Sequence, residues 1–170
     1  TKSYAFTIKQ NKYVAPSGDT ATLTNEEIVA ALSAGTQTKD VYENVSISST
    51  SGTWTANVNA KNTLTYLQIR NKTNANITSP EFEKNIQKIV VHTASNATAD
   101  RTLYAVPVDT DLSSTSNFTL DTFSTNFGSG KTGTDGDTDV EIEFNADTKQ
   151  FKLGVYGGAT YVSSITVYFK

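Results

Sequence analysis

The segment Val140-Glu-Ile-Glu-Phe144 alternates apolar and polar residues, and the same period of two continues in two later segments. Phe151 and Leu153 alternate with polar positions in the second, and Ile165-Thr-Val-Tyr-Phe169 alternates in the third. Successive side chains of a β-strand point to opposite faces, so this pattern predicts strands with one face in a core and one in solvent. Such strands are typical of antiparallel sheets. The last third of the chain therefore predicts an all-β fold.

The same alternation recurs toward the N-terminus. Its apolar positions are Tyr4, Phe6 and Ile8, then Val45 and Ile47, Leu67 and Ile69, Ile89 and Val91, and Leu103 and Ala105. Val90 makes one of these strands apolar on both faces, which predicts a central position in its sheet. Asn145-Ala-Asp-Thr148 separates two alternating runs and predicts a hairpin loop. Eight or more strands at this spacing predict an antiparallel two-sheet β-sandwich, jelly-roll-like in architecture.

One segment, at about residues 25–34, predicts a short helix instead. Thr24-Asn-Glu-Glu27 has the spacing of a capping box, and Leu23 and Ile28 stand where a hydrophobic staple would. Gly35 is expected to end the helix in a left-handed conformation. The buried residues of this helix should be Ile28, Val29 and Leu32, and we expect it to close one end of the sandwich.

Composition excludes several classes of protein. The 170 residues include no cysteine, so a disulfide scaffold or a cysteine-ligated metal site is impossible. The net charge of −3 leaves no surplus of Lys and Arg for a nucleic-acid binder of the usual basic kind. No apolar run approaches the ~20 residues of a membrane-spanning helix. Because no linker, charge block or repeat divides the chain, we expect residues 1–170 to form a single β-sandwich domain.

The chain is also rich in small polar residues, with 28 Thr, 16 Ser and 14 Asn. This enrichment, together with the lack of cysteine, is common in secreted or surface-exposed bacterial domains. We therefore expect an extracellular location, either secreted or at the cell surface.

No catalytic residues are indicated by the sequence. His92 is the single histidine, and no nucleophile motif accompanies it, so a position at the surface or at a strand end is the better interpretation. Glu141 and Glu143 lie on one face of one strand, whereas a glycosidase acid and base must straddle the substrate bond. A solvated outer face explains these two carboxylates better. The sequence therefore predicts a protein that is not an enzyme.

An acidic loop is the strongest indication of a metal site. Asp135-Gly-Asp137-Thr-Asp139 places carboxylates at alternate positions, where they can converge on a hard cation such as calcium. The spacing differs from that of an EF-hand loop. Two interpretations stay open, a structural Ca²⁺ site and an acidic turn in solvent, and no other cofactor is indicated.

Aromatic and planar polar side chains are the remaining candidates for a site. Aromatic faces can stack on sugar rings, while Arg, Gln and Asn can meet sugar hydroxyls. Two tyrosines flank Gly157-Gly158, where backbone can approach a ligand closely. The candidate ligand-binding residues are Trp54, Tyr66, Gln68, Arg70, Tyr156 and Tyr161. Packing in the core or at its rim is the alternative for Trp54 and for each tyrosine.

A family resemblance points the same way. The final third, Val140-Glu-Ile-Glu-Phe144 through Phe151-Lys-Leu153 to Ser163-Ser-Ile-Thr-Val-Tyr168, resembles the closing hairpin of carbohydrate-binding-module-like β-sandwich domains. Those domains occur in secreted and surface proteins of gut and rumen bacteria. Their centre is similar to Tyr66-Leu-Gln-Ile-Arg70, Ile77-Thr-Ser79 and Ile86-Gln-Lys-Ile-Val-Val91. The resemblance implies a sandwich fold, and the helix at 25–34 and the Asp-rich loop lie outside its pattern.

Two functions follow as hypotheses. The first is a non-catalytic polysaccharide-binding module or surface glycan-binding protein, whose partners would be a polysaccharide and a catalytic domain in the parent protein. The second is a structural or adhesive extracellular subunit of the pilin, filament or phage-decoration type, acting through protein–protein contacts. Affinity for a polysaccharide distinguishes the two.

Overall fold

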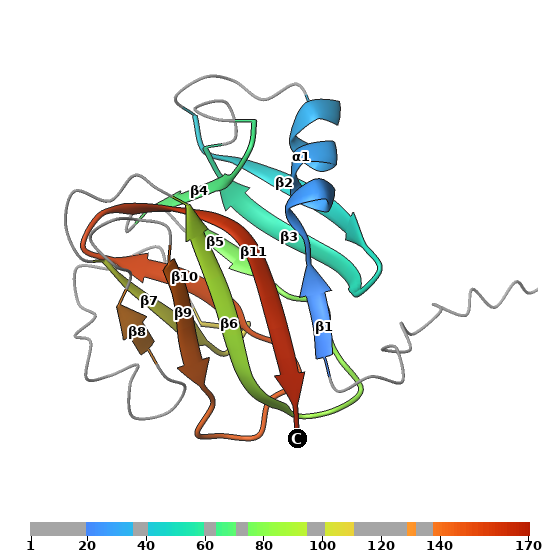
Figure 1. Ribbon diagram of the computed structural model, residues 1–170, viewed down its shortest axis with the longest axis vertical. Helices are drawn as coiled ribbons and strands as arrows, with labels where there is room; N and C mark the ends of the chain where they lie inside the picture. Colours follow the sequence, from blue (N-terminus) through green and yellow to red (C-terminus); the bar gives the residue numbers. More distant parts are fainter. Residues whose placement is uncertain are drawn as a thin grey trace, which may run out of the picture.

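A computed structural model describes residues 20–35, 41–59, 64–70, 75–94, 101–110, 129–131 and 138–170 of this chain. The structure contains two antiparallel sheets, as the sequence predicts, and they face each other in a sandwich (Figure 1). The first predicted strand, at Tyr4, Phe6 and Ile8, lies outside the described residues.

The first sheet has five strands. Its main path runs in the order β1-β11-β6-β9, and β4 pairs with β11. Tyr161 and Val162 of β11 each pair with one residue of β4 and with one residue of β6. Strand β4 therefore lies on the side of β11 away from β6, and β1 pairs with another part of β11 on that same side. The bounds are β1 Thr20–Leu23, β4 Leu67–Arg70, β6 Ile86–Ala94, β9 Thr138–Glu143 and β11 Ala159–Phe169. The predicted central position of the strand containing Val90 is confirmed, because β6 lies between β11 and β9.

The second sheet has six strands in the order β2-β3-β5-β10-β7-β8. A two-residue turn joins β2 to β3, and this pair is a true hairpin in which Ser49 is opposite Gly52. The bounds are β2 Glu43–Ser49, β3 Gly52–Val58, β5 Asn76–Thr78, β7 Thr102–Val106, β8 Ser129–Lys131 and β10 Lys152–Tyr156.

The strand order corrects one prediction. Asn145–Thr148 is not a hairpin loop, because β9 belongs to the first sheet and β10 to the second. The chain crosses back at Gly157 and Gly158, whose φ angles of 90° and 142° favour glycine. The closing hairpin that the resemblance implies is therefore absent, since β9 and β11 both pair with β6. Alternation and turn residues are the same for a hairpin and for a crossing between sheets, so the sequence could not separate the two.

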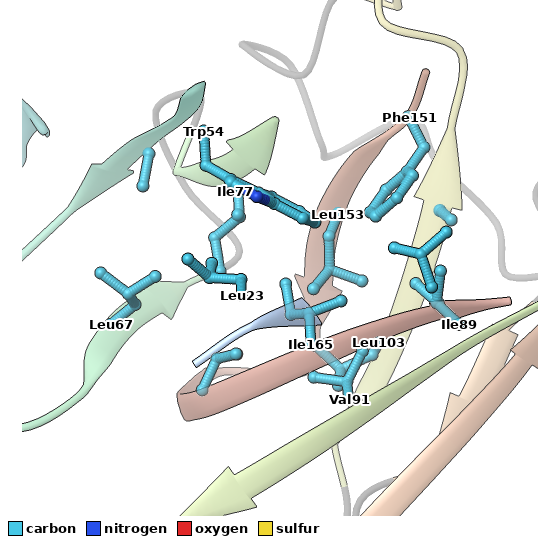
Figure 2. Close-up of a cluster of buried hydrophobic side chains, with 14 of the residues drawn as sticks. Leu23, Trp54, Leu67, Ile77, Ile89, Val91, Leu103, Phe151, Leu153 and Ile165 are labelled. Atoms are coloured by element: carbon cyan, nitrogen blue, oxygen red, sulfur yellow. The ribbon is translucent and has the colours of Figure 1, made fainter. Parts of the chain in front are cut away.

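The core lies between the sheets, and most of its residues are the inward residues of the alternating strands (Figure 2). Ile47, Leu67, Ile89, Leu153 and Ile165 are all fully buried, as their phase in the sequence predicts. Burial of such side chains contributes about 1.5–3 kcal/mol each and is the main stabilising term of the fold.

Helix α1 (Asn25–Ala34) has the bounds that the sequence predicts, and its capping box is present. The Thr24 side chain accepts from the backbone N–H of Glu27, and a Glu27 carboxylate oxygen accepts from the backbone N–H of Thr24 at 2.9 Å. The helix follows β1 and packs against β2 (Figure 1), with Ile28 and Leu32 in the core.

Two details of the helix differ from expectation. Val29 is half-buried, because it lies on the flank of the face that Ile28 and Leu32 present to the core. Gly35 has φ −86° and ψ 167°, so the chain leaves the helix in an extended conformation and not through a left-handed residue. In the described part of the chain, no helix is long and apolar enough to span a membrane.

Candidate functional site

Four of the six predicted ligand-binding residues lie together on the outer face of the five-stranded sheet. In β4, Leu67 and Ile69 point into the core. Gln68 and Arg70 alternate with them and therefore lie on the outer face, and Tyr66, two residues before Gln68, lies on the same face. Tyr161 of β11 is directly opposite Gln68. The antiparallel register thus brings residues 66–70 against a residue that is distant in the sequence.

These side chains contact one another. The rings of Tyr66 and Tyr161 have centroids 6.2 Å apart, and their planes are tilted by 36°. Gln68 Nε2 donates a hydrogen bond to the Tyr161 hydroxyl at 3.2 Å. Both rings are half-buried, so each keeps part of its surface exposed. The pair offers apolar ring surface beside hydrogen-bonding groups, which is what a sugar ring requires of a binding surface.

A fifth residue, Tyr42, joins this cluster just before β2. The Arg70 guanidinium carbon lies 5.8 Å from the centre of the Tyr42 ring, in cation–π range. Burial raises the pKa of the Tyr42 hydroxyl, while the positive charge of Arg70 acts in the opposite direction. Tyr161 is near enough to contribute to the same electrostatic balance. We call Tyr42, Tyr66, Gln68, Arg70 and Tyr161 the tyrosine cluster.

A groove of about 540 Å³ adjoins this cluster at Tyr66. The other residues that line it come from β1, α1, β6 and β11 and are mostly hydrogen-bonding; they are Thr22, Thr24, Asn25, His92, Ala94, Ser163 and Ser164. The groove therefore continues the ring surface of the cluster with hydroxyl, amide and imidazole groups.

Asn25 fixes the wall of this groove where β1 ends and β4 begins. Its side-chain amide donates to the carbonyl of Thr65 at 2.9 Å and to that of Ser163 at 3.4 Å. Ser163 lies at a register shift of β11, between the residues that pair with β4 and those that pair with β1. The capped helix thus anchors the segment that carries Tyr66.

Glu27 also holds the start of α1 in place, through hydrogen bonds from two backbone N–H groups. Burial acts to raise the pKa of its carboxyl group, but hydrogen bonds from the backbone N–H groups of Thr24 and Thr50 outweigh it, and the pKa is lowered. Because Glu27 also accepts from Thr50 at 2.9 Å, it ties the helix start to the β2–β3 turn.

Trp54 is not part of a surface site, contrary to its inclusion among the candidate residues. Its side chain is fully buried, with the rings of Phe82 and Phe151 packed edge-on at centroid distances of 6.3 and 5.9 Å. Its indole N–H donates to Ser51 Oγ at 2.9 Å, so its one polar group is also satisfied. The small residues before Trp54 belong to the β2–β3 turn and to the start of β3, and the alternation of side chains along β3 points the Trp54 ring into the core (Figure 2).

Tyr156 is exposed but is not brought into the tyrosine cluster. It ends β10, which pairs with β5 and β7 in the other sheet. Across the β10–β7 pair it is opposite Thr102.

Only one residue of the predicted metal site lies in the described part of the chain. Asp135 and Asp137 are outside it, whereas Asp139 lies on the exposed face of β9. Asp139 Oδ1 is 2.7 Å from His92 Nδ1, so its carboxylate is engaged with the imidazole. Within the described ranges, no group of three acidic or histidine side chains is placed to hold a metal ion.

The carboxylates of Glu141 and Glu143 are exposed on the outer face of β9, as expected from the sequence. Glu141 forms an ion pair with Lys88 of the neighbouring strand, with a separation of 2.7 Å. This places Glu141 in a cross-strand pair on an open sheet surface.

A second polar surface covers the outer face of the six-stranded sheet. Asn44, Asn57 and Asn76 are in register across β2, β3 and β5, and the neighbouring row is Ser46, Thr55 and Thr78. A groove of about 660 Å³ lies over them. None of the described residues that line this groove is aromatic, so it offers hydrogen bonds without a ring to stack on.

The sequence did not indicate Tyr42, Asn25 or the role of His92 in lining the groove. These three residues join the site through cross-strand register or through the packing of α1. A single segment of sequence reveals neither the register nor the packing. For Tyr42, the only local signal is its position just before an alternating strand.

No family model and no curated protein matches this chain. Its function is therefore inferred from the side chains on this face.

Proposed function

We propose that this protein is a non-catalytic, polysaccharide-binding β-sandwich that acts as an accessory module or surface glycan-binding protein outside the cell. The observation that carries the proposal is the tyrosine cluster and the groove that it adjoins. Two tyrosine rings in contact, an amide, a guanidinium and several hydroxyl groups share one outer face of the sandwich.

The ligand would lie along this face, with a sugar ring against Tyr66 or Tyr161 and its hydroxyl groups in the groove. Small-molecule and glycan sites combine apolar surface with a few placed polar groups, and this face has both. Tyrosine is suited to the role because its ring is rigid and loses little conformational entropy on binding. The proposal includes no catalytic residue, and a catalytic domain would be a neighbour in the parent protein.

Affinity electrophoresis tests the proposal, with soluble xylans, glucans, mannans and pectins in the gel. Wild type should be retarded by at least one polymer, and Tyr66→Ala or Tyr161→Ala should lose that retardation. Tyr168→Ala is the matched control, because Tyr168 is also a half-buried tyrosine on the outer face of β11 but packs against Lys88 at its far end.

Loss of retardation in Tyr168→Ala as well would show that the cluster is not the specific site. Retardation by no polymer would contradict the proposal and favour the structural or adhesive subunit. In that case, self-association measured by size-exclusion chromatography with light scattering would be the next observation.

A further inference from the structure

We propose that the tyrosine cluster selects an anionic glycan, one whose sugar carboxylates are bound by Arg70. This inference rests on the proposed function and names the class of ligand for the same site. Three features support it: the way Arg70 is held, its lack of an acidic partner among the described residues, and the rarity of arginine in the sequence.

Arginine is rare in this chain. The sequence has 14 Lys and Arg in total, and Arg70 and Arg101 are its two arginines. Lysine is therefore the usual cation of this chain, although arginine and lysine are not equivalent. The planar guanidinium can bind a carboxylate through two parallel N–H donors, whereas the lysine ammonium is a point charge.

The two arginines have different surroundings. The Arg101 guanidinium lies over Gly158, so close that a Cβ at that position would be 2.5 Å from Nε, and this side chain is packed into the β10–β11 turn. Arg70 is exposed, and it contacts Tyr42 both over the ring and through a hydrogen bond to the hydroxyl. Contact with a single tyrosine orients a guanidinium, and because the group has five N–H donors, others can still bind a ligand.

Arg70 also lacks an acidic partner among the described residues. By contrast, Lys88 pairs with Glu141, His92 with Asp139 and Lys170 with Asp147. An exposed, oriented guanidinium beside Gln68 and two tyrosine rings is suited to a sugar that carries a carboxylate. Because the whole chain is negative, selection of an anion must come from a local charge such as this one.

The test compares polygalacturonate with the same polymer after full methyl esterification, which removes the charge and keeps the sugar backbone. Affinity of the wild-type chain should be higher for the acid form and should fall as salt is added. Arg70→Gln should lower affinity for the acid form by at least about tenfold, the equivalent of about 1.4 kcal/mol, and should lower affinity for the ester form by much less. Arg70→Lys should fall between, since it keeps the charge without the paired donors.

Lys170→Gln is the matched control, because it removes the same charge from a different exposed position, an ion pair with Asp147. It should leave the preference for the acid form intact. Thermal unfolding of each variant confirms that the compared chains are folded.

Equal affinity for the acid and ester forms, or an equal loss for both in Arg70→Gln, would overturn the selection of an anion and leave the proposed function standing. A polymer panel in which only neutral glycans bind would do the same. Failure to bind any polymer would overturn the proposed function, and this inference with it.

Discussion

Aromatic side chains gather in two regions of this sandwich, and their surroundings differ. Inside, Trp54 packs edge-on against Phe82 and Phe151, and Phe82 packs in the same way against Phe169. On the outer face, Tyr66 and Tyr161 pack against each other between polar side chains. The interior rings make contact with other apolar groups, whereas the outer rings combine apolar surface with hydroxyl, amide and guanidinium groups.

This contrast indicates which property each region should control. Interior rings fill the space between the sheets, so their loss leaves a cavity in a close-packed core. Outer rings lose little packing when removed but change the surface that a ligand would meet. Stability and binding should therefore respond to different substitutions.

Trp54→Ala should have the largest effect on stability, a loss of about 3–5 kcal/mol. The side chain is fully buried, and its removal takes away both ring contacts and the hydrogen bond to Ser51 Oγ. Chemical unfolding followed by far-UV circular dichroism measures the loss, since the variant has no tryptophan left for fluorescence. A variant of unchanged stability that no longer binds polysaccharide would contradict the separation of the two regions.

Tyr104 is intermediate between the regions, because it lies on the outer face of its sheet yet is buried. Its ring covers Gly154 of the paired strand, and burial raises the pKa of its hydroxyl to about 12. In the unfolded chain the pKa of this hydroxyl lies near its ordinary value of 10.0. The free energy of unfolding is therefore unaffected by this group below pH 10, and it falls as the pH rises toward 12. The loss should reach about 2–3 kcal/mol, at about 1.4 kcal/mol for each unit of pKa difference.

Tyr104→Phe isolates this effect, because other groups also titrate in alkali. Above pH 10, the free energy of unfolding of wild type should fall relative to that of the variant. A difference that is constant across that range would show that Tyr104 is not buried as described.

The sequence predicts the interior region better than the outer one. Period-two alternation assigns Ile47, Leu67 and Ile165 to the core, and each is fully buried. The capping box predicts where α1 begins, because all of its partners lie within a single helical turn. These predictions succeed because the relevant interactions repeat locally or are dictated by side-chain phase.

The site depends instead on contacts between distant segments. Gln68 and Tyr161 meet through the β4–β11 register, and Tyr42 meets Arg70 from a third segment. The sequence placed Gln68 and Arg70 on an outward face, but it could not show that their strand pairs with the strand of Tyr161. For Trp54, the phase of β3 relative to its sheet decides burial, and the turn before it obscured that phase.

Tyr161→Phe should have a smaller effect than either earlier change, a loss of about 1 kcal/mol. The variant keeps the ring but removes the hydroxyl that accepts a hydrogen bond from Gln68, which is buried. Polysaccharide affinity should be largely retained, in contrast to Tyr161→Ala. Retardation in affinity electrophoresis and unfolding by denaturant measure the two quantities. Equal loss of binding in both variants would assign the contact to the hydroxyl and not to the ring.

Tyr156→Ala should have the smallest effect. Its side chain is 41% exposed on a strand of the opposite sheet, so little packing is lost and the free energy of unfolding should change by no more than about 0.5 kcal/mol. Retardation by polysaccharide should equal that of wild type, because the ring lies outside the tyrosine cluster. If Tyr156→Ala lost binding while Tyr66→Ala kept it, the ligand would lie near the β10–β11 turn, and the outer face of β4 and β11 would not be the binding surface.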